Sequence, residues 1–346
     1  MHTPIAVSDR PEGDHVRAVW LKEFGGPEVL VASDTPDPVA GPGQALVEVA
    51  FANITFVETQ FRAGGFGPFK AELPMIPGNG VGGVVVAVGE GADDRLVGTR
   101  VVCGTGGSGG YAELAAVDAA GLIEVPDGLA LDSAVALLAD GRTAMWLLQT
   151  AAPRPGERVL VEAAAGGVGG LLVQLARAAG ATVIAAAGGA DKGRVARDLG
   201  ADVAVDYLQA DWTDRVRENG GGVDVAFDGV GGEIGRSAFD LLERRGRMLS
   251  FGMASGRWTG VSEEEAADRD VLLLRGAQLT PEASRAFTAD ALAEAAAGRL
   301  RPSIGQRFPL ERAADAHAAI QSRATVGKTL LVTGRSPGTG NPLDGA

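Results

Sequence analysis

The sequence contains few of the side chains that crosslink a chain or bind metals. Its 346 residues include one cysteine, Cys103, and three histidines, His2, His15 and His317. A single cysteine excludes an internal disulfide and a four-cysteine structural zinc site. Catalytic zinc needs about three protein ligands, usually drawn from cysteine, histidine and carboxylate side chains. The chain offers little of this kind, so we expect no metal site.

Long apolar runs and basic clusters are also missing. No segment approaches the ~18 consecutive apolar residues that predict a membrane span, and the N-terminus lacks the basic and apolar stretches of a secretory signal. The formal net charge is −13, whereas nucleic-acid binding needs a clustered basic face. We therefore expect a cytoplasmic protein that binds neither nucleic acid nor a membrane.

The pattern along the chain changes twice. Residues 16–130 alternate short β-rich runs with Gly and Pro turns, which predicts a small, mostly β domain. Residues 131–279 alternate strands with helices, as in a parallel sheet covered on both faces. Residues 280–334 contain two helical stretches and a closing strand, 328–332, that we expect to return to the first domain. The polar, Gly- and Pro-rich tails expected to be mobile are residues 1–15 and 335–346.

The fold class expected is α/β, with a doubly wound parallel sheet of the Rossmann type beside the mostly β domain. Apolar runs of strand length predict the sheet. The predicted strands are 158–162, 182–187, 203–205, 223–227, 247–251 and 271–274.

A glycine-rich loop follows the first of these strands. Residues 163–170 read Ala-Ala-Ala-Gly-Gly-Val-Gly-Gly and lead into a helical repeat that ends at Gly180. Pyrophosphate binding needs a tight turn, close backbone approach and free amides at a helix N-terminus. The dinucleotide fingerprint would have glycine at Ala164, so the motif alone also fits a loop whose glycines only permit packing.

The second strand indicates which dinucleotide is bound. NAD-binding domains place an acid at its tip to hold the ribose hydroxyls, whereas here Gly188 and Gly189 follow the strand and Asp191 is the nearest acid. Lys192, with Arg194 nearby, has the charge to neutralise an adenosine 2′-phosphate. This favours NADPH, although Lys192 also fits an exposed residue in the first turn of a helix.

Short motifs recur in a fixed order between residues 17 and 332. Together with the glycine loop they resemble the quinone oxidoreductase (zeta-crystallin-like) branch of the medium-chain dehydrogenases/reductases, which is zinc-independent. Zinc-using relatives carry Gly-His-Glu where this chain has Gly78-Asn79-Gly80. The motifs lie at 24–30, 77–78, 109–113, 141–144, 228–232, 249–252 and 327–329.

The resemblance implies a GroES-like catalytic domain built from both chain ends, an inserted Rossmann domain, and NADPH as the cofactor. Lys192 and Tyr207 match positions near the adenosine phosphate, and Phe251 and Gly252 match positions by the nicotinamide ribose. Tyr207 also fits an aromatic residue that packs on a helix. The expected cofactor-binding residues are Ala165, Gly166, Gly167, Val168, Gly169, Gly188, Lys192, Tyr207, Gly229, Val230, Phe251, Gly252 and Lys328.

The expected catalytic residues are Thr55, Gln60 and Tyr111. Relatives usually carry Asn where Thr55 stands and often Tyr where Gln60 stands, so the substrate is less defined than the cofactor. Thr55 has a hydroxyl that can hydrogen-bond a carbonyl oxygen, but it also fits a β-branched residue in a strand. We expect His317 to be a helix-surface residue.

The resemblance implies hydride transfer from NADPH to a small-molecule acceptor, either a quinone or an α,β-unsaturated carbonyl compound (enone). Two alternatives stay open: a pathway-specific enoyl or enone reductase, and a non-catalytic NADPH-binding protein on the same fold. Residues 271–275 read as an apolar edge strand, and such edges are often covered by a second copy. We therefore expect a homodimer.

Overall fold

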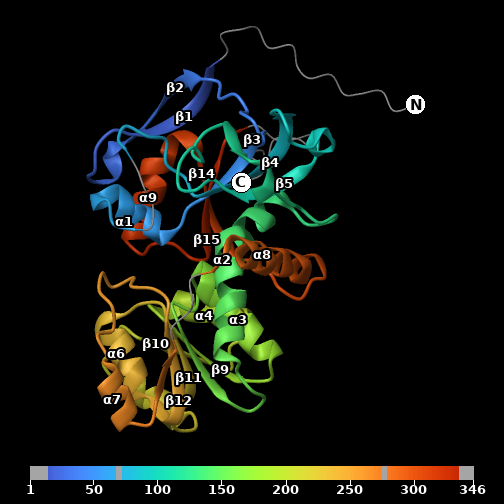
Figure 1. The fold of residues 1–346 in the computed structure, drawn as a ribbon. Coiled ribbons are helices and arrows are strands. Elements are labelled where there is room, and N and C mark those ends of the chain that lie inside the picture. Colours follow the sequence, from blue (N-terminus) through green and yellow to red (C-terminus); the bar gives the residue numbers. More distant parts are fainter. Residues whose placement is uncertain (1–14, 68–71, 275–278, 335–346) are drawn as a thin grey trace. The chain divides into compact units, whose positions relative to one another are not determined.

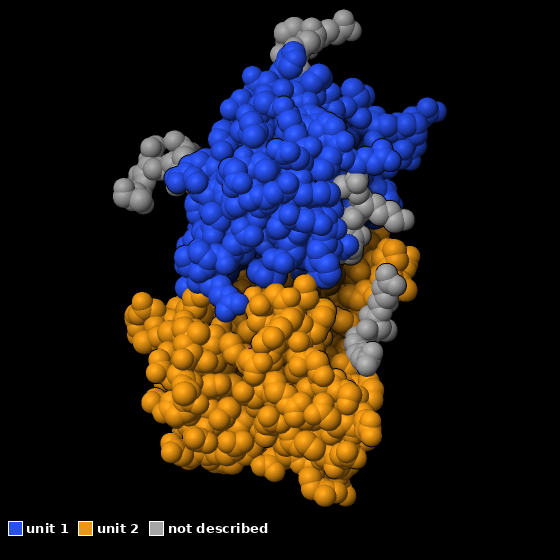
Figure 2. All heavy atoms as spheres, turned by 90° about the vertical axis from the view of Figure 1, so that its left-hand side faces the viewer, with its two compact units in different colours: residues 1–139, 304–346 blue, residues 140–303 orange. Residues whose placement is uncertain are grey.

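A computed structural model describes residues 15–67, 72–274 and 279–334, which form two compact units (Figures 1 and 2). One unit comprises residues 1–139 and 304–346, and the other comprises residues 140–303. The tails expected to be mobile lie outside the described residues, except that His15 already begins the first strand. No helix in the described ranges is long and apolar enough to cross a membrane.

The first unit is mostly β, as expected. A two-stranded sheet pairs β1 with β2, and a seven-stranded sheet has the order β14-β15-β3-β4-β5-β7, with β6 also paired to β3. The strands are β1 (His15–Leu21), β2 (Leu30–Pro36), β3 (Gln44–Asn53), β4 (Gly80–Val88), β5 (Arg100–Gly104), β6 (Leu114–Asp118), β7 (Ile123–Glu124), β14 (Ile304–Pro309) and β15 (Lys328–Val332). The α-helices are α1 (Phe56–Gly64) and α9 (Ala313–Gln321), and short 3-10 helices are η1 (Pro27–Val29), η2 (Asp94–Leu96), η3 (Ala119–Gly121) and η4 (Leu310–Arg312).

Strands β3 and β4 pair antiparallel in the middle of the seven-stranded sheet. Val47, Val49 and Ala52 of β3 are fully buried in one apolar core. The two strands approach so closely that a Cβ on Gly83 would lie 1.8 Å from the carbonyl oxygen of Glu48. Only glycine permits this spacing. The expected return of the chain end is confirmed, because β15 pairs antiparallel with β3.

The second unit is a parallel sheet in the order β10-β9-β8-β11-β12-β13, which confirms the doubly wound fold. Since crossovers are right-handed, α3 and α4 cover one face and α6 and α7 the other (Figure 1). Its strands are β8 (Arg158–Glu162), β9 (Thr182–Ala187), β10 (Val203–Asp206), β11 (Val223–Asp228), β12 (Leu242–Ser250) and β13 (Leu272–Leu274). Its helices are α3 (Gly167–Ala178), α4 (Ala190–Asp198), α5 (Trp212–Glu218), α6 (Gly232–Asp240), α7 (Glu263–Asp268) and α8 (Pro281–Ala296), while α2 (Leu131–Ala151) crosses the boundary at 139/140.

The strand order reverses between β8 and β11. At such a switch point the loops leaving neighbouring strands diverge, and a crevice opens at the carboxyl ends of the strands. The chain passes from one compact unit to the other at 139/140 and at 303/304. The boundaries expected from the sequence are 130/131 and 279/280. The differences arise because α8 groups with the Rossmann unit, whereas the first part of α2 groups with the mostly β unit. The functional domain boundaries stay a prediction.

Candidate functional site

The glycine loop leaves β8 at the switch point and leads into α3. Gly166 is the N-cap of α3, and the first intrahelical bond runs from the Gly170 N–H to the Gly166 carbonyl (2.9 Å). The intervening amides lie in the first turn, where the helix supplies no acceptor and its dipole favours an anion. A Cβ on Gly169 would lie 2.3 Å from the carbonyl oxygen of Ala163, so glycine is required there. This geometry fits a pyrophosphate.

Two of the residues expected near an adenosine 2′-phosphate, Gly188 and Tyr207, lie together at the end of β9. A Cβ on Gly188 would lie 3.2 Å from the ring of Tyr207, so this ring lies against bare backbone. Lys192 is half-buried in the first turn of α4. Arg194, considered as a second cation, instead forms an exposed ion pair with Asp191. Lys192 stays our candidate for the phosphate, because its place in the first turn of α4 is nearer the end of β9.

An acid that the sequence analysis did not consider also lies here, at the end of β10. The carboxylate of Asp206 accepts the N–H groups of Gly189 (2.9 Å) and Leu208 (3.0 Å). Both bonds hold the loops that follow β9 and β10. The end of β9 therefore has a negative charge nearby that the sequence analysis did not foresee. This makes the positive charge of Lys192 more important for binding the 2′-phosphate of NADPH.

The residues expected by the nicotinamide ribose form a second backbone platform. The Ser255 N–H donates to the Val230 carbonyl (2.8 Å), which ties the loop after β11 to the segment after β12. A Cβ on Gly229 would lie 2.8 Å from the Phe251 ring, and one on Gly252 would lie 2.6 Å from the Gly229 carbonyl oxygen. Glycines are needed here because a side chain at 229 would meet the Phe251 ring and one at 252 would meet the Gly229 backbone.

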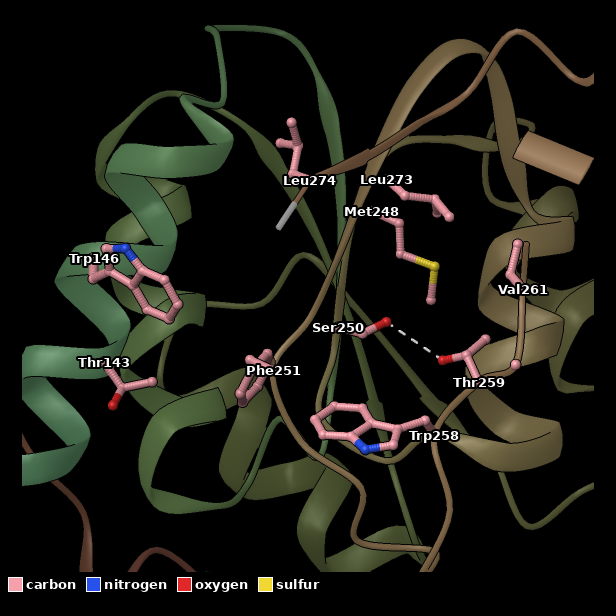
Figure 3. A pocket seen from close by; sticks show the side chains of 11 residues that line it. Thr143, Trp146, Met248, Ser250, Phe251, Trp258, Thr259, Val261, Leu273 and Leu274 are labelled. Carbon is pink, nitrogen blue, oxygen red and sulfur yellow. Dashed lines mark hydrogen bonds between the residues drawn. The ribbon is translucent and has the colours of Figure 1, made fainter. Parts of the chain in front are cut away.

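A pocket of about 700 Å³ with both apolar and hydroxyl side chains in its walls opens beside this platform, within the second unit (Figure 3). Trp146 lies on the α2 side, and Trp258 lies on the loop that follows β12. Phe251 lies between them in the view, and the Ser250 hydroxyl contacts that of Thr259 (3.4 Å). The walls suit a flat, apolar ring, since aromatic side chains bind such rings with large contact area. The lining residues are Thr143, Trp146, Met248, Ser250, Phe251, Trp258, Thr259, Gly260, Val261, Leu273 and Leu274.

In the first unit Thr55 directly precedes α1, so the interpretation of Thr55 as a strand residue is wrong. It is the N-cap of a capping box in which its backbone N–H (2.6 Å) and its hydroxyl (2.7 Å) donate to Glu58. Burial raises the pKa of Glu58, and the Thr55 bonds and the Lys328 charge offset this only in part. Gln60 is half-buried on the same helix.

Tyr111 and His317 form a buried pair, which corrects the expectation that His317 lies on a helix surface. His317 is 1% exposed, and its Nε2 lies 3.0 Å from the Tyr111 hydroxyl. Burial, and then the Glu58 carboxylate, raise the pKa of Tyr111 well above its ordinary value. Tyr111 is fully buried, so a direct contact with a substrate is disfavoured. Lys328, expected to bind cofactor, is 4% exposed and acts electrostatically on Glu58.

Besides Asp206, sequence reasoning missed the roles of four polar residues that organise the two sites. Glu58 carried a signal, because Thr-x-x-Glu before an apolar run marks a capping box. His317 carried none, because its burial depends on a tyrosine distant in the chain. Glu162 and Asp228, at the ends of β8 and β11, become neighbours only through the strand order.

The described residues do not fit a zinc ion. No group of three or more His, Cys, Asp or Glu among them is arranged to hold a metal. Burial raises the pKa of the Cys103 thiol to about 12, so the thiolate that zinc prefers is disfavoured. His2 lies outside the described residues.

Comparisons with known proteins agree with this architecture. Residues 41–127 match the family model of the alcohol dehydrogenase GroES-like domain, and residues 167–281 match that of the zinc-binding dehydrogenases. A quinone oxidoreductase from Pseudomonas aeruginosa is 35% identical over 324 residues, which covers 91% of this chain and 99% of the relative.

Two further relatives extend the comparison. A 2-haloacrylate reductase from Burkholderia sp is 34% identical over 329 residues, covering 92% of this chain and 99% of the relative. The structure of Escherichia coli quinone oxidoreductase complexed with NADPH superposes with a TM-score of 0.84 at 31% identity, covering 91% of this chain and 99% of that one. The chain therefore belongs to the medium-chain dehydrogenase/reductase family and is an oxidoreductase related to the quinone oxidoreductases.

Proposed function

We propose that this protein is a zinc-independent, NADPH-dependent reductase that acts on a quinone or an α,β-unsaturated carbonyl compound. The observation that carries the proposal is the glycine-lined N-terminus of α3 at the switch point, with Gly188 and Lys192 following the next strand, β9. These features fit the pyrophosphate and the 2′-phosphate of one dinucleotide. Relatives in complex with NADPH support the same choice.

NADPH, when bound, supplies hydride from its nicotinamide ring, and the chain's own residues position the reactants. Backbone amides of the α3 N-terminus hold the pyrophosphate, and Lys192 with Tyr207 hold the adenosine end. Gly229, Val230, Phe251 and Gly252 shape the nicotinamide half. The pocket beside Phe251, with Trp146 and Trp258 in its walls, favours a flat, electron-poor acceptor.

Thr55 is the group that we propose to polarise the acceptor oxygen. Its hydroxyl is held by the Glu58 carboxyl (2.7 Å), and the raised pKa of Glu58, caused mainly by burial, favours a proton on that carboxyl. A protonated Glu58 can donate to Thr55, which frees the Thr55 hydroxyl to donate to a carbonyl oxygen. Gln60 lies on the same helix as a further polar contact. Tyr111 lies in the core and positions Thr55 and Gln60 indirectly: its hydroxyl bonds to His317 and interacts with Glu58.

Both classes of acceptor are proposed because quinones and enones react with hydride in the same way. Quinones and enones each accept hydride at one carbon and develop charge on a conjugated oxygen. The relative named 2-haloacrylate reductase supports an α,β-unsaturated carbonyl compound as the acceptor. The relatives named quinone oxidoreductase support a quinone. A pathway-specific enone reductase stays the second candidate, because Thr55 and Gln60 replace the residues usual in the branch.

The experiment is an NADPH-oxidation assay with purified protein and a panel of naphthoquinones, phenanthrenequinone, acrylates and cyclic enones. We expect turnover of at least one class, and a loss of about 10²-fold in kcat for Thr55→Val with recovery in Thr55→Ser, as for other groups that stabilise developing charge. NADPH binding without oxidation by any acceptor would favour the non-catalytic alternative. A homodimer and a cytoplasmic location are proposed with this function.

A further inference from the structure

Two acids end neighbouring strands at the switch point. Glu162 is the last residue of β8 and Asp228 the last of β11, and these strands pair in parallel up to Val161 and Phe227. The two side chains therefore lie side by side at the carboxyl edge of the sheet. Both residues are fully buried, where a lone carboxylate is unfavourable.

Asp228 is the acceptor for two different segments. Its Oδ1 accepts the N–H groups of Val230 (3.1 Å) and Gly231 (2.6 Å), in the loop that opens α6. Its Oδ2 accepts the hydroxyls of Ser250 (2.7 Å), the last residue of β12, and of Thr259 on the segment that follows β12. One carboxylate thus joins the two segments that we assign to the nicotinamide half of the coenzyme.

Glu162 lies beneath this junction and leads directly into the phosphate loop. Its Oε2 accepts the Val230 N–H (3.1 Å), and its Oε1 has no hydrogen-bond partner within the described structure. Burial, and then the neighbouring Asp228 carboxylate, raise the pKa of Glu162 well above its ordinary value. Two buried carboxyl groups in contact hold one proton more readily than two charges. Glu162 is the better holder of such a proton, because four N–H and O–H donors face Asp228 and one faces Glu162.

Other charged groups at this edge act on different partners. On α2, a Cβ added to Gly167 would lie 1.9 Å from Asp140, so this acid faces the phosphate loop, and Asp140 acts electrostatically on Arg142. Near α6, Arg257 forms an exposed ion pair with Glu233 (2.9 Å). The charged side chain that raises the pKa of Glu162 is that of Asp228.

We propose that the proton shared by Glu162 and Asp228 holds the coenzyme-binding loops together, so that Glu162 is a positioning residue for NADPH. Loss of this proton places two charges in contact, draws Asp228 away from the amides of Val230 and Gly231, and loosens the platform. Coenzyme affinity then falls as the pH rises. This inference rests on the proposed function.

The test is a fluorescence titration of NADPH into the full-length protein between about pH 6 and about pH 9. Wild-type affinity falls with rising pH, by up to about tenfold per pH unit once Glu162 ionises. Glu162→Gln keeps the shape and a donor but cannot ionise, so its affinity changes much less. Lys192 is present in both proteins, so their difference isolates Glu162. Asp224→Asn is the matched control, because Asp224 accepts the Arg158 N–H at the opposite end of β11 (2.8 Å).

A second measurement needs neither NADPH nor a variant. In the free wild-type protein, the hydrogen-exchange rates of the Val230 and Gly231 amides should rise with pH more steeply than the intrinsic rate of an unprotected amide. The rates of amides in the core of β11 should rise only as steeply as the intrinsic rate. Equal pH profiles of NADPH affinity in wild type and Glu162→Gln, or exchange at Val230 that follows intrinsic chemistry, would overturn the proposal. If NADPH binds at no pH, the proposed function fails, and the exchange experiment still decides about the carboxyl pair.

Discussion

His317 connects two elements that are distant in sequence, through one hydrogen bond in the core of the first unit. Its ring lies in an edge-to-face arrangement with Tyr111, at 5.8 Å between centroids. Burial, followed by the positive charge of Arg62, lowers the pKa of His317 to about 3. The folded protein therefore keeps this imidazole neutral at pH values where an unfolded chain would charge it.

His317→Gln tests this at the level of stability. A histidine whose folded pKa is depressed contributes stability that is present above about pH 6.5 and is lost as the pH falls towards 3. Between pH 7 and pH 5 the wild type should lose about 2 kcal/mol through this group, at about 1.4 kcal/mol per pH unit below 6.5. Urea unfolding of both proteins at the two pH values measures it. If the stability difference between them is independent of pH, the assignment is wrong.

Lys192→Ala tests the choice of coenzyme. A charge-assisted hydrogen bond contributes about 1.5–3 kcal/mol, so NADPH should bind about 10- to 100-fold more weakly while NADH binding changes little. Arg194→Ala is the matched control, since Arg194 lies on the same helix but pairs with Asp191 and is 72% exposed. Equal losses for both coenzymes in Lys192→Ala would refute the phosphate role.

At the scale of elements, the turn between β8 and α3 is the most constrained. Gly169→Ala would place a methyl group 2.3 Å from the Ala163 carbonyl oxygen, which forces the loop to move at a cost of about 1–3 kcal/mol. We expect lower thermal stability and loss of NADPH binding, measured by calorimetry.

Gly193→Ala is the control for that loop. Gly193 lies within α4, and a Cβ on it would have its nearest neighbour, the Cβ of Ala204, at 3.8 Å. Alanine should therefore stabilise the helix by about 0.5–1 kcal/mol and preserve NADPH binding. Gly169→Ala protein that binds NADPH as tightly as wild type would contradict the close backbone approach.

The elements that sequence patterns predicted best are those with strong periodicity. Strands β8 and β9 and helix α3 agree with expectation because an apolar run and a helical apolar repeat flank the glycine loop. Helix α1 was not foreseen, since it is short and the preceding strand hides its start. The burial of His317 depends on Tyr111, 206 positions away, and the contact between Glu162 and Asp228 depends on strand order. Patterns within a short window do not contain such information.

At the scale of the whole molecule, the free edge of the second unit's sheet predicts self-association. Strand β13 pairs with β12 alone among the described strands, and Leu272 on it is 60% exposed. Apolar edges of this kind favour pairing with another copy.

Leu272→Arg should convert the proposed homodimer into a monomer, as measured by light scattering at micromolar concentration. Leu208→Arg is the control, because Leu208 is 64% exposed but lies outside the strands, and it should remain dimeric. A monomeric wild-type protein would contradict the assembly.

The central claim concerns the whole second unit: its switch point binds a phosphorylated dinucleotide through backbone amides and one lysine. Isothermal calorimetry of the wild-type protein with NADPH and with NADH tests it most directly. The account predicts saturable binding of one NADPH per chain, tighter than that of NADH. Absence of binding by either coenzyme, or tighter binding of NADH, would contradict it.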